Sequence, residues 1–183
     1  MILETDRLFL QSPNETDPDA VCAYYRANWS FLKSFEPPRP ADFFTPEGQR
    51  ILLDGQIRSW AEDRAYRFCL LVKDSREVVG SAALNEVVRG PFQSCFLGYQ
   101  LDAAHRGQGL MPEAVRRIVR FAFEELDLHR IEGNVMPRNR ASIAVLEKCG
   151  FACEGLSRKY LNINGVWEDH LHYVRLNEAT ADK

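Results

Sequence analysis

The sequence lacks any apolar run of about 18 residues, the length that a membrane-spanning helix requires. Its first residues, MILETDRLFLQSP, have no basic flank followed by an apolar segment, so we expect no secretory signal. Internal repeats and low-complexity tracts are absent from the sequence as well. These absences argue against a membrane-spanning, fibrous or disordered protein.

An excess of charge of one sign is also missing, because 23 Lys and Arg face 26 Asp and Glu for a net charge of −3. The sequence therefore shows no basic footprint of the kind that nucleic-acid-binding proteins carry. A weakly acidic protein is compatible with a cationic substrate such as an amine. The cysteines are odd in number and no two have CxxC spacing: Cys22, Cys69, Cys95, Cys149 and Cys153. This usage predicts free thiols and a cytoplasmic protein.

What is present is an ordinary globular composition over 183 residues, with 45% hydrophobic and 27% charged residues, and we expect one domain spanning 1–183. Hydrophobic periodicity and turn residues predict helices at 18–33, 46–62, 112–126 and 139–148. They predict strands at 7–11, 66–73, 77–88, 94–101, 130–136, 151–157 and 168–176. An antiparallel meander is thus followed by alternating strands and helices. We predict an α+β fold with one mixed, mostly antiparallel sheet of about seven strands and flanking helices.

A glycine-rich turn between the strand at 94–101 and the helix at 112–126 is the most informative segment. Gly107 and Gly109 allow a phosphate to approach the backbone closely, and the following helix offers free amides and the positive end of its dipole. Arg106 adds a charged donor, so the turn can hold a pyrophosphate. A P-loop is excluded because its lysine and spacing are absent. Two alternatives stay open: a dinucleotide turn, although Pro112 stands where the third glycine belongs, and a glycine turn without a ligand.

The segment from Arg106 to Met111 resembles the R/Q-x-x-G-x-G/A motif of the GNAT N-acetyltransferases, with Met111 in place of the small last residue. The stretch from Asn134 to Gly155 resembles the N-x-x-S and G-F…E-G pattern of the RimJ/RimL branch. Further similar segments lie at 31–37, 85–90 and 164–170, and they are closer to the RimJ group. The resemblance extends from residue 4 to about residue 176.

This resemblance implies the GNAT fold, in which the fourth and fifth predicted strands part and acetyl-CoA, as cosubstrate, lies in the gap. It implies cofactor-binding roles for Tyr99, Leu101, Arg106, Gly107, Gln108, Gly109, Leu110, Met111, Asn139 and Ser142. Gly98 predicts a bulge or a close backbone approach in its strand. Such a bulge would aim the Leu101 amide at the thioester oxygen, where it would stabilise developing negative charge.

An amine acceptor must lose a proton before it attacks the thioester, and the departing thiolate needs a donor. By resemblance, Ser142 is the acid, although a hydroxyl in the first turn of a helix also bonds local backbone. Asn139 matches the position that binds the pantetheine arm, and it can equally cap the helix. The branch's candidate glutamate base is missing, because 159–163 has no carboxylate. Glu36 and Asp169 remain as candidates to hold the ammonium or relay its proton, unless they are ordinary surface carboxylates.

The resemblance implies an acetyl-CoA-dependent N-acetyltransferase that acts on the α-amino group of a protein N-terminus, in a protein of the small ribosomal subunit. Two alternatives stay open: acetylation of a small amine such as a polyamine, an antibiotic or an amino-acid analogue, and a non-catalytic module for ribosome assembly. We expect no metal site, because His170 and His172 share a strand face without a third ligand. No direct nucleic-acid site or membrane contact is expected, and the sequence does not determine the oligomeric state.

Overall fold

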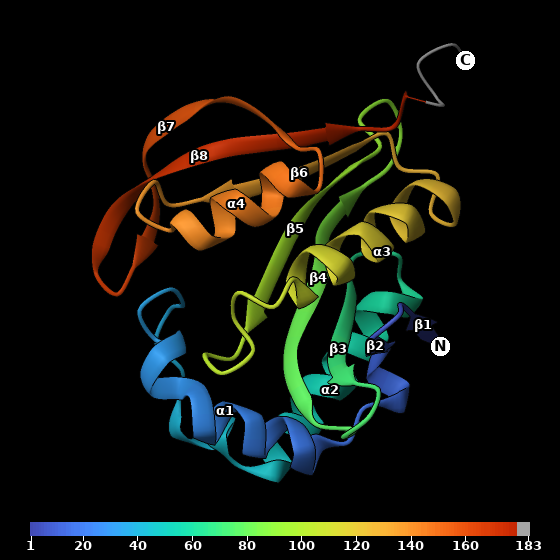
Figure 1. Ribbon diagram of the computed structural model, residues 1–183, viewed down its shortest axis with the longest axis vertical. Helices are drawn as coiled ribbons and strands as arrows, with labels where there is room; N and C mark the ends of the chain where they lie inside the picture. The colour runs from blue at the N-terminus through green and yellow to red at the C-terminus, as the bar shows by residue number, and fades with distance from the viewer. Residues whose placement is uncertain (179–183) are drawn as a thin grey trace.

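The computed structural model describes residues 1–178, which form one eight-stranded mixed sheet in the order β1-β2-β3-β4-β5-β6-β8-β7 (Figure 1). The strands are β1 (Ile2–Glu4), β2 (Leu8–Gln11), β3 (Tyr66–Val72), β4 (Val78–Val88), β5 (Ser94–Leu101), β6 (Arg130–Val135), β7 (Ala152–Ile163) and β8 (Val166–Leu176). Neighbouring strands are antiparallel except β5 and β6, which are parallel. The α+β prediction is confirmed. The additional strand is β1, whose three residues are too few to show a period in the sequence.

Four α-helices cover the sheet over the described residues: α1 (Pro18–Leu32), α2 (Pro46–Ala61), α3 (Leu110–Glu124) and α4 (Arg140–Lys148). Two short 3-10 helices, η1 (Pro13–Glu15) and η2 (Ala41–Phe44), precede α1 and α2. Local sequence explains where α1 and α2 begin, because Asp17 and Thr45 accept hydrogen bonds from the first turn and a proline follows each. α3 begins at Leu110, two residues before the predicted start, since a proline is tolerated within the first helical turn.

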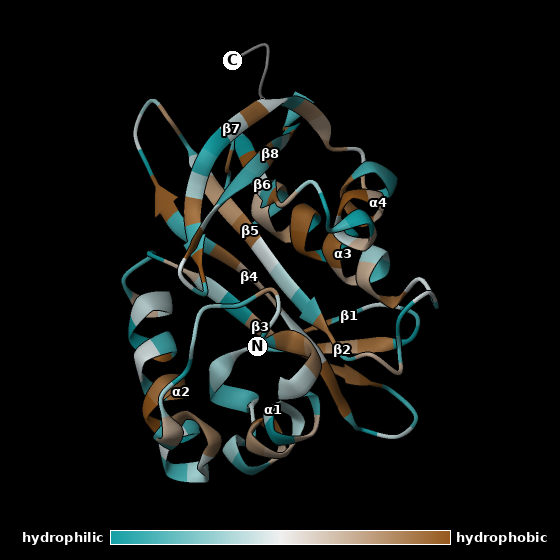
Figure 2. Cartoon of the chain, turned by 90° about the vertical axis from the view of Figure 1, so that its left-hand side faces the viewer, coloured by the Kyte–Doolittle hydropathy of each residue, from teal (hydrophilic) through white to brown (hydrophobic). Residues whose placement is uncertain are grey.

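The two pairs of helices lie on opposite faces of the sheet. Gln100 of β5 bonds Tyr25 of α1, whereas its neighbour Tyr99 bonds Ser142 of α4. Successive side chains of a strand point to opposite faces, so α1 and α4 lie on different faces. In both views α1 and α2 are grouped together, apart from α3 and α4 (Figure 1, Figure 2). The apolar side of α3, including Val115 and Ile118, is fully buried in the main core.

The sheet opens between β5 and β6, as predicted for the fourth and fifth strands. Pairing begins at Ser94↔Arg130 and stops at Phe96↔Glu132, while β5 continues to Leu101. In Figure 1, β6, β8 and β7 fan away from β5 beyond this point. The unpaired edge of β5 leaves room for an extended molecule to lie alongside it.

Gly98 predicted either a bulge or a close backbone approach, and of these the bulge is wrong. The β4–β5 register runs unbroken from Gly80↔Leu101 to Asn85↔Phe96, and the irregularity lies beyond Asn85, where Glu86 of β4 has a φ of 50°. Gly98 instead allows a close approach, since an added Cβ would lie 3.3 Å from the Asn85 side-chain nitrogen. The gap beside β5 therefore arises from the divergence of β6.

The five cysteines are free, as predicted, and only Cys153 is exposed. Burial raises the pKa of the Cys69 and Cys95 thiols to about 12, so both stay protonated and pack as small apolar groups. Among the helices of residues 1–178, none has the length and apolar character needed to cross a membrane.

Candidate active site

A cavity of about 330 Å³ lies where the gap beside β5 meets α3 and α4, and we call it the cofactor cavity. It brings together ten of the predicted site residues: Glu36, Tyr99, Leu101, Arg106, Gly107, Gly109, Leu110, Met111, Asn139 and Ser142. Two other predicted residues, Gln108 and Asp169, do not line it. Lys148 also lines the cavity, as do Phe31 and Phe35. Nothing in the local sequence of Lys148 distinguishes it from a solvated helix residue.

The glycine turn has the backbone expected of an anion site. Gly107 and Gly109 have φ values of 75° and 77°, in the left-handed region that disfavours a Cβ atom. Gly109 is the N-cap of α3 and caps it without a side chain, so the first amides of the helix remain open to a ligand. Met111 is buried in the core, which explains how a large residue fits at the last motif position.

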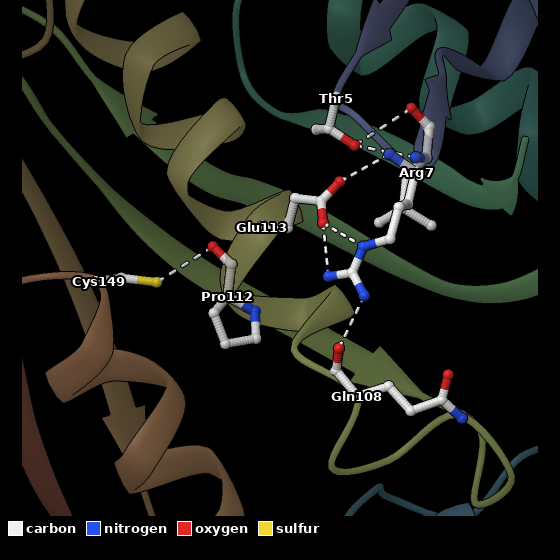
Figure 3. A network of polar contacts seen from close by, with 7 residues as sticks. Thr5, Arg7, Gln108, Pro112, Glu113 and Cys149 are labelled. Carbon is white, nitrogen blue, oxygen red and sulfur yellow. Dashed lines mark hydrogen bonds and ion pairs between the residues drawn. The ribbon is translucent and has the colours of Figure 1, made fainter.

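Gln108 contributes through its backbone. Its carbonyl oxygen accepts a hydrogen bond of 2.9 Å from the Arg7 guanidinium, while its own side-chain amide donates to the Ala104 carbonyl. Arg7 also donates to both oxygens of Glu113, from its amide at 2.9 Å and its Nε at 2.8 Å (Figure 3). Arg7 therefore joins the glycine turn, the first turn of α3 and the chain just before β2. The sequence analysis missed this clamp because the partners are more than one hundred residues apart.

Glu113 is held in its charged form by this clamp. Its burial by itself would raise the pKa, but hydrogen bonds from Thr5 and from the amide and guanidinium of Arg7 lower it below the ordinary value of 4.5. The carboxylate also lies in the first turn of α3, where negative charge is favourable. The glycine turn is thus braced before any ligand arrives.

Tyr99, Asn139 and Ser142 form a hydrogen-bonded group at the start of α4. The Asn139 side chain caps the helix by accepting from the Ser142 amide at 3.2 Å. The Tyr99 hydroxyl donates to the Ser142 carbonyl at 3.0 Å and lies 2.8 Å from Ser142 Oγ. Burial raises the pKa of Tyr99, so its hydroxyl keeps its proton. Ser142 Oγ therefore has a permanent hydrogen-bond partner at the edge of the cavity.

The Leu101 amide faces the gap. The amide of the next residue, Asp102, donates to the Val79 carbonyl of β4 at 2.9 Å. Because successive amides of a strand point to opposite edges, the Leu101 amide points away from β4 and toward the open side of β5. It is therefore a donor directed at a ligand that lies beside the strand.

The loop between β5 and the glycine turn is held by Asp102, which is 5% exposed. Its carboxylate accepts from the His105 amide at 2.8 Å and contacts His105 Nδ1 at 2.9 Å. The Arg106 guanidinium lies 5.1 Å from the centre of the Phe31 ring, which connects the loop to α1. His105 lines the cofactor cavity, a placement that the sequence analysis did not anticipate.

The two candidate carboxylates are in different surroundings. Glu36 lines the cofactor cavity, its side chain is 16% exposed, and it forms an ion pair of 2.9 Å with Arg39. Asp169 lies on β8 and accepts a hydrogen bond of 2.8 Å from the Lys159 amide, where β7 has a φ of 51°. The fold therefore places Glu36, rather than Asp169, beside the gap.

A groove on the opposite face of the sheet leads to the same gap, and we call it the acceptor groove. Phe96 and Gly98 of β5, Asn134 of β6 and Tyr160 of β7 are among the residues that line it, and Asn134 donates to the Tyr160 hydroxyl at 3.2 Å. Elsewhere on the hairpin, the turn between β7 and β8 contacts the end of α1, because Asn164 donates to the Lys33 carbonyl at 2.8 Å.

Glu86 also lines the acceptor groove, as an exposed carboxylate that the sequence analysis had not singled out as a site residue. The rings of His170 and His172 pack on Tyr160. Over residues 1–178 no group of three or more His, Cys, Asp or Glu side chains could hold a metal ion. The two histidines therefore belong to the packing of the β7–β8 hairpin.

Comparison with known proteins agrees with this geometry. Residues 7–152 match the model of the acetyltransferase (GNAT) domain. The chain is 40% identical to the probable N-acetyltransferase YjcK of Bacillus subtilis over 176 residues, which cover 96% of this chain and 97% of that protein. It is 37% identical to the [ribosomal protein uS5]-alanine N-acetyltransferase of Escherichia coli over 170 residues, which cover 92% of this chain and 87% of the relative.

Solved structures show the same similarity in three dimensions. The ribosomal-protein-S5-alanine acetyltransferase of Vibrio fischeri superposes with a TM-score of 0.91 at 32% identity, over 97% of each chain. Mycobacterium smegmatis RimJ, in complex with CoA-disulfide, superposes with a TM-score of 0.82 at 26% identity, over 95% of this chain and 84% of that one.

Proposed function

Because this chain belongs to the GNAT acetyltransferase family, we propose that it transfers the acetyl group of acetyl-CoA to the α-amino group of a protein N-terminus. Acetyl transfer from acetyl-CoA to an amine is the reaction of the family; the identity of the acceptor is the proposal. The observation that carries it is the meeting of two sites at one gap. The cofactor cavity opens on one face of the sheet and the acceptor groove on the other, with β5 between them.

The residues of the cofactor cavity fit the parts of acetyl-CoA. The open amides of the turn from Gly107 to Met111, with Arg106, suit the pyrophosphate, and the left-handed glycines leave the space that a Cβ would fill. The free edge of β5 and the Asn139 side chain suit the amides of the pantetheine arm. No metal is required for this binding, since the donors are all protein amides and side chains.

In the proposed transfer, each group at the gap has a distinct role. The acceptor ammonium loses a proton to water held by Glu36, and the free amine attacks the thioester carbon. The Leu101 amide donates to the thioester oxygen as negative charge develops there. The carbon–sulfur bond then breaks, and Ser142 gives its proton to the departing thiolate while Tyr99 donates a hydrogen bond to Ser142 Oγ. The second proton leaves the acylated nitrogen through water and restores the Ser142 hydroxyl. The products are the N-acetylated acceptor and coenzyme A.

An extended acceptor suits the shape of the groove. It is open to solvent and is lined in part by residues of β5, β6 and β7. A relative that is 37% identical is named as an alanine N-acetyltransferase of ribosomal protein uS5. We therefore assign a ribosomal protein N-terminus as the acceptor and the cytoplasm as the place of reaction.

Mass spectrometry of a competition mixture tests this function. The mixture contains acetyl-CoA, spermidine, and peptides with free or blocked N-termini, including the N-terminal sequence of ribosomal protein uS5. We expect one acetyl group to be added only to peptides with a free α-amine. Acetylation of spermidine but of no peptide would instead indicate an acetyltransferase of small amines. Binding of acetyl-CoA without acetylation of any amine would support a non-catalytic module instead.

A further inference from the structure

A separate cavity of about 280 Å³ lies between the sheet and the α1–α2 side of the molecule, and we call it the Arg67 cavity. Gln100 lines both this cavity and the cofactor cavity. Asn85, Ser59 and Ala65 line both this cavity and the acceptor groove. The Arg67 cavity therefore adjoins the place where the acceptor approaches, on the face of the sheet opposite α3 and α4.

The floor of the cavity is hollow because small residues stand beside Arg67 in the sheet. The register aligns Arg67 of β3 with Ala83 of β4, and Ala83 with Gly98 of β5. In the adjacent row, Cys69 is aligned with Ser81 and Ser81 with Gln100. Side chains of one row share a face, so the positions beside Arg67 on its face of the sheet carry little or no side chain. Space is thus left above the sheet beside the Arg67 side chain.

The guanidinium of Arg67 has few partners within the described residues. Its only hydrogen bond there is a long one of 3.4 Å to Ser81 Oγ, and it forms no ion pair with a carboxylate in residues 1–178. The second arginine of the lining, Arg39, is paired with Glu36. No Asp or Glu is among the residues that line the cavity. The cavity therefore contains an uncompensated positive charge.

Two tyrosine hydroxyls add further donors. Tyr24 is 5% exposed, and its buried hydroxyl has no hydrogen-bond partner within the described residues. The Tyr25 hydroxyl accepts a bond of 2.6 Å from Gln100, which leaves its own proton available to an acceptor. Burial raises the pKa of both tyrosines, so both keep their protons. Unsatisfied buried donors beside a guanidinium are costly unless an acceptor-rich group enters.

We propose that the Arg67 cavity binds a carboxylate of the acceptor, with Arg67, Tyr24 and Tyr25 as its donors. A carboxylate has two oxygens and accepts bidentate bonds from arginine, which matches this set of donors. The inference rests on the proposed function, because it takes the molecule that delivers the amine at the gap as the one that delivers the carboxylate. The carboxylate belongs to an acidic side chain, either of a residue near a peptide N-terminus or of a free amino acid such as glutamate.

Acetylation rates of matched acceptors test this site. The probes are a C-amidated Ala-Ser-Ser-Ser-Ser-Tyr peptide, its variants with one glutamate or one glutamine at the second, third, fourth or fifth position, and free glutamate and glutamine. We expect kcat/KM for one glutamate peptide, or for free glutamate, to exceed that of its glutamine counterpart by about 10-fold. This ratio corresponds to the free energy that one charge-assisted hydrogen bond contributes. Arg67→Gln should abolish this preference by lowering kcat/KM for the glutamate acceptor to that of its glutamine counterpart.

Matched variants separate recognition from misfolding. Arg50→Gln removes the same charge from an exposed ion pair on α2 and should keep the preference for glutamate. Arg67→Glu should reverse it, so that a lysine at the preferred position restores the rate. Tyr24→Phe should weaken the preference less than Arg67→Gln does. Equal kcat/KM for glutamate and glutamine acceptors in the wild-type enzyme would overturn the inference and leave the proposed function standing.

A binding measurement covers the case in which none of these acceptors is acetylated. Peptides that already carry the N-acetyl group are titrated calorimetrically into the enzyme with coenzyme A, in glutamate and glutamine versions, alongside free glutamate and glutamine. Tighter binding of a glutamate form, lost in Arg67→Gln, would support the carboxylate site even if peptide acetylation failed. Equal dissociation constants for every pair would overturn it.

Discussion

At the scale of single residues, the proposed acetyl transfer depends on a small number of groups that lie at the gap beside β5. Ser142 Oγ is 2.8 Å from the Tyr99 hydroxyl, which also donates to the Ser142 carbonyl. When Tyr99 donates to the carbonyl, the Ser142 proton points at Tyr99; when it donates to Oγ, that proton is free to point into the gap. A thiolate in the gap favours the second arrangement, because a charged acceptor binds a donor more strongly than a neutral one.

Replacing Ser142 by alanine should therefore lower kcat by on the order of 100-fold, the usual contribution of a positioned acid. The dissociation constant for acetyl-CoA, measured by calorimetry, should stay near that of the wild type. Tyr99→Phe should lower kcat less, and the double variant should be no slower than Ser142→Ala, because Tyr99 acts through Ser142. Wild-type turnover in Ser142→Ala would remove this serine from the mechanism. Fully additive losses would separate Tyr99 from it.

At the scale of elements, the joint between β5 and α3 forms the proposed cofactor site. β5 ends beside the gap, the loop is held by Asp102, and the two left-handed glycines expose the first amides of α3. Arg7 braces this joint through the Gln108 carbonyl. The N-terminus of α3 is therefore fixed in position before a pyrophosphate binds, which lowers the entropy cost of binding.

Gly109→Asp should weaken acetyl-CoA binding by about 100-fold or more, because a carboxylate would replace hydrogen bonds to phosphate with repulsion. Gly109→Asn is the matched control, since asparagine has the same shape and also tolerates a φ of 77°. Calorimetric titration of both variants, after a thermal melt shows them folded, separates charge from backbone strain. Similar affinities for the two variants would mean that no phosphate lies at Gly109.

At the scale of the whole molecule, distant parts of the chain are joined by ion pairs and hydrogen bonds. Arg7 and Glu113 connect the chain before β2 with α3, and Asn164 and Lys33 connect the β7–β8 turn with α1. Arg7 also bonds the Gln108 carbonyl, within the glycine turn whose residues line the cofactor cavity. The stability of the fold and the shape of the site therefore depend on the same contacts.

The Arg7–Glu113 pair gives stability a dependence on pH. The pKa of Glu113 is lower in the folded chain than its ordinary value of 4.5, so its contribution is present above pH 4.5 and is lost as pH falls through the folded pKa. Glu113→Gln should cost about 1 kcal/mol at pH 7 in urea unfolding, and the difference should shrink toward zero below that range. Glu47→Gln, in an exposed pair with Arg50, should change little. An equal cost at acidic and neutral pH would contradict this account.

Much of the fold and part of the site could be predicted from local sequence. The helices at α1, α2 and α4 were placed within one or two residues, because caps and periodicity are local properties of the chain. The glycine turn, its left-handed residues and the free cysteines were also predictable for this reason. β1 was missed because three residues show no period, and the bulge was misplaced because Gly98 provides a close approach instead.

By itself, then, the sequence determined most of the elements, the position of the glycine turn and the family. Only the tertiary structure decided which side chains meet: Arg7 with the glycine turn, Tyr99 with Ser142, and Glu36 but not Asp169 with the cofactor cavity. It alone placed Arg67 over Ala83 and Gly98, with two tyrosine hydroxyls nearby. The physical reason is that turns and caps depend on neighbours in the chain. Contacts between remote residues depend instead on strand register and on the packing of helices against the sheet.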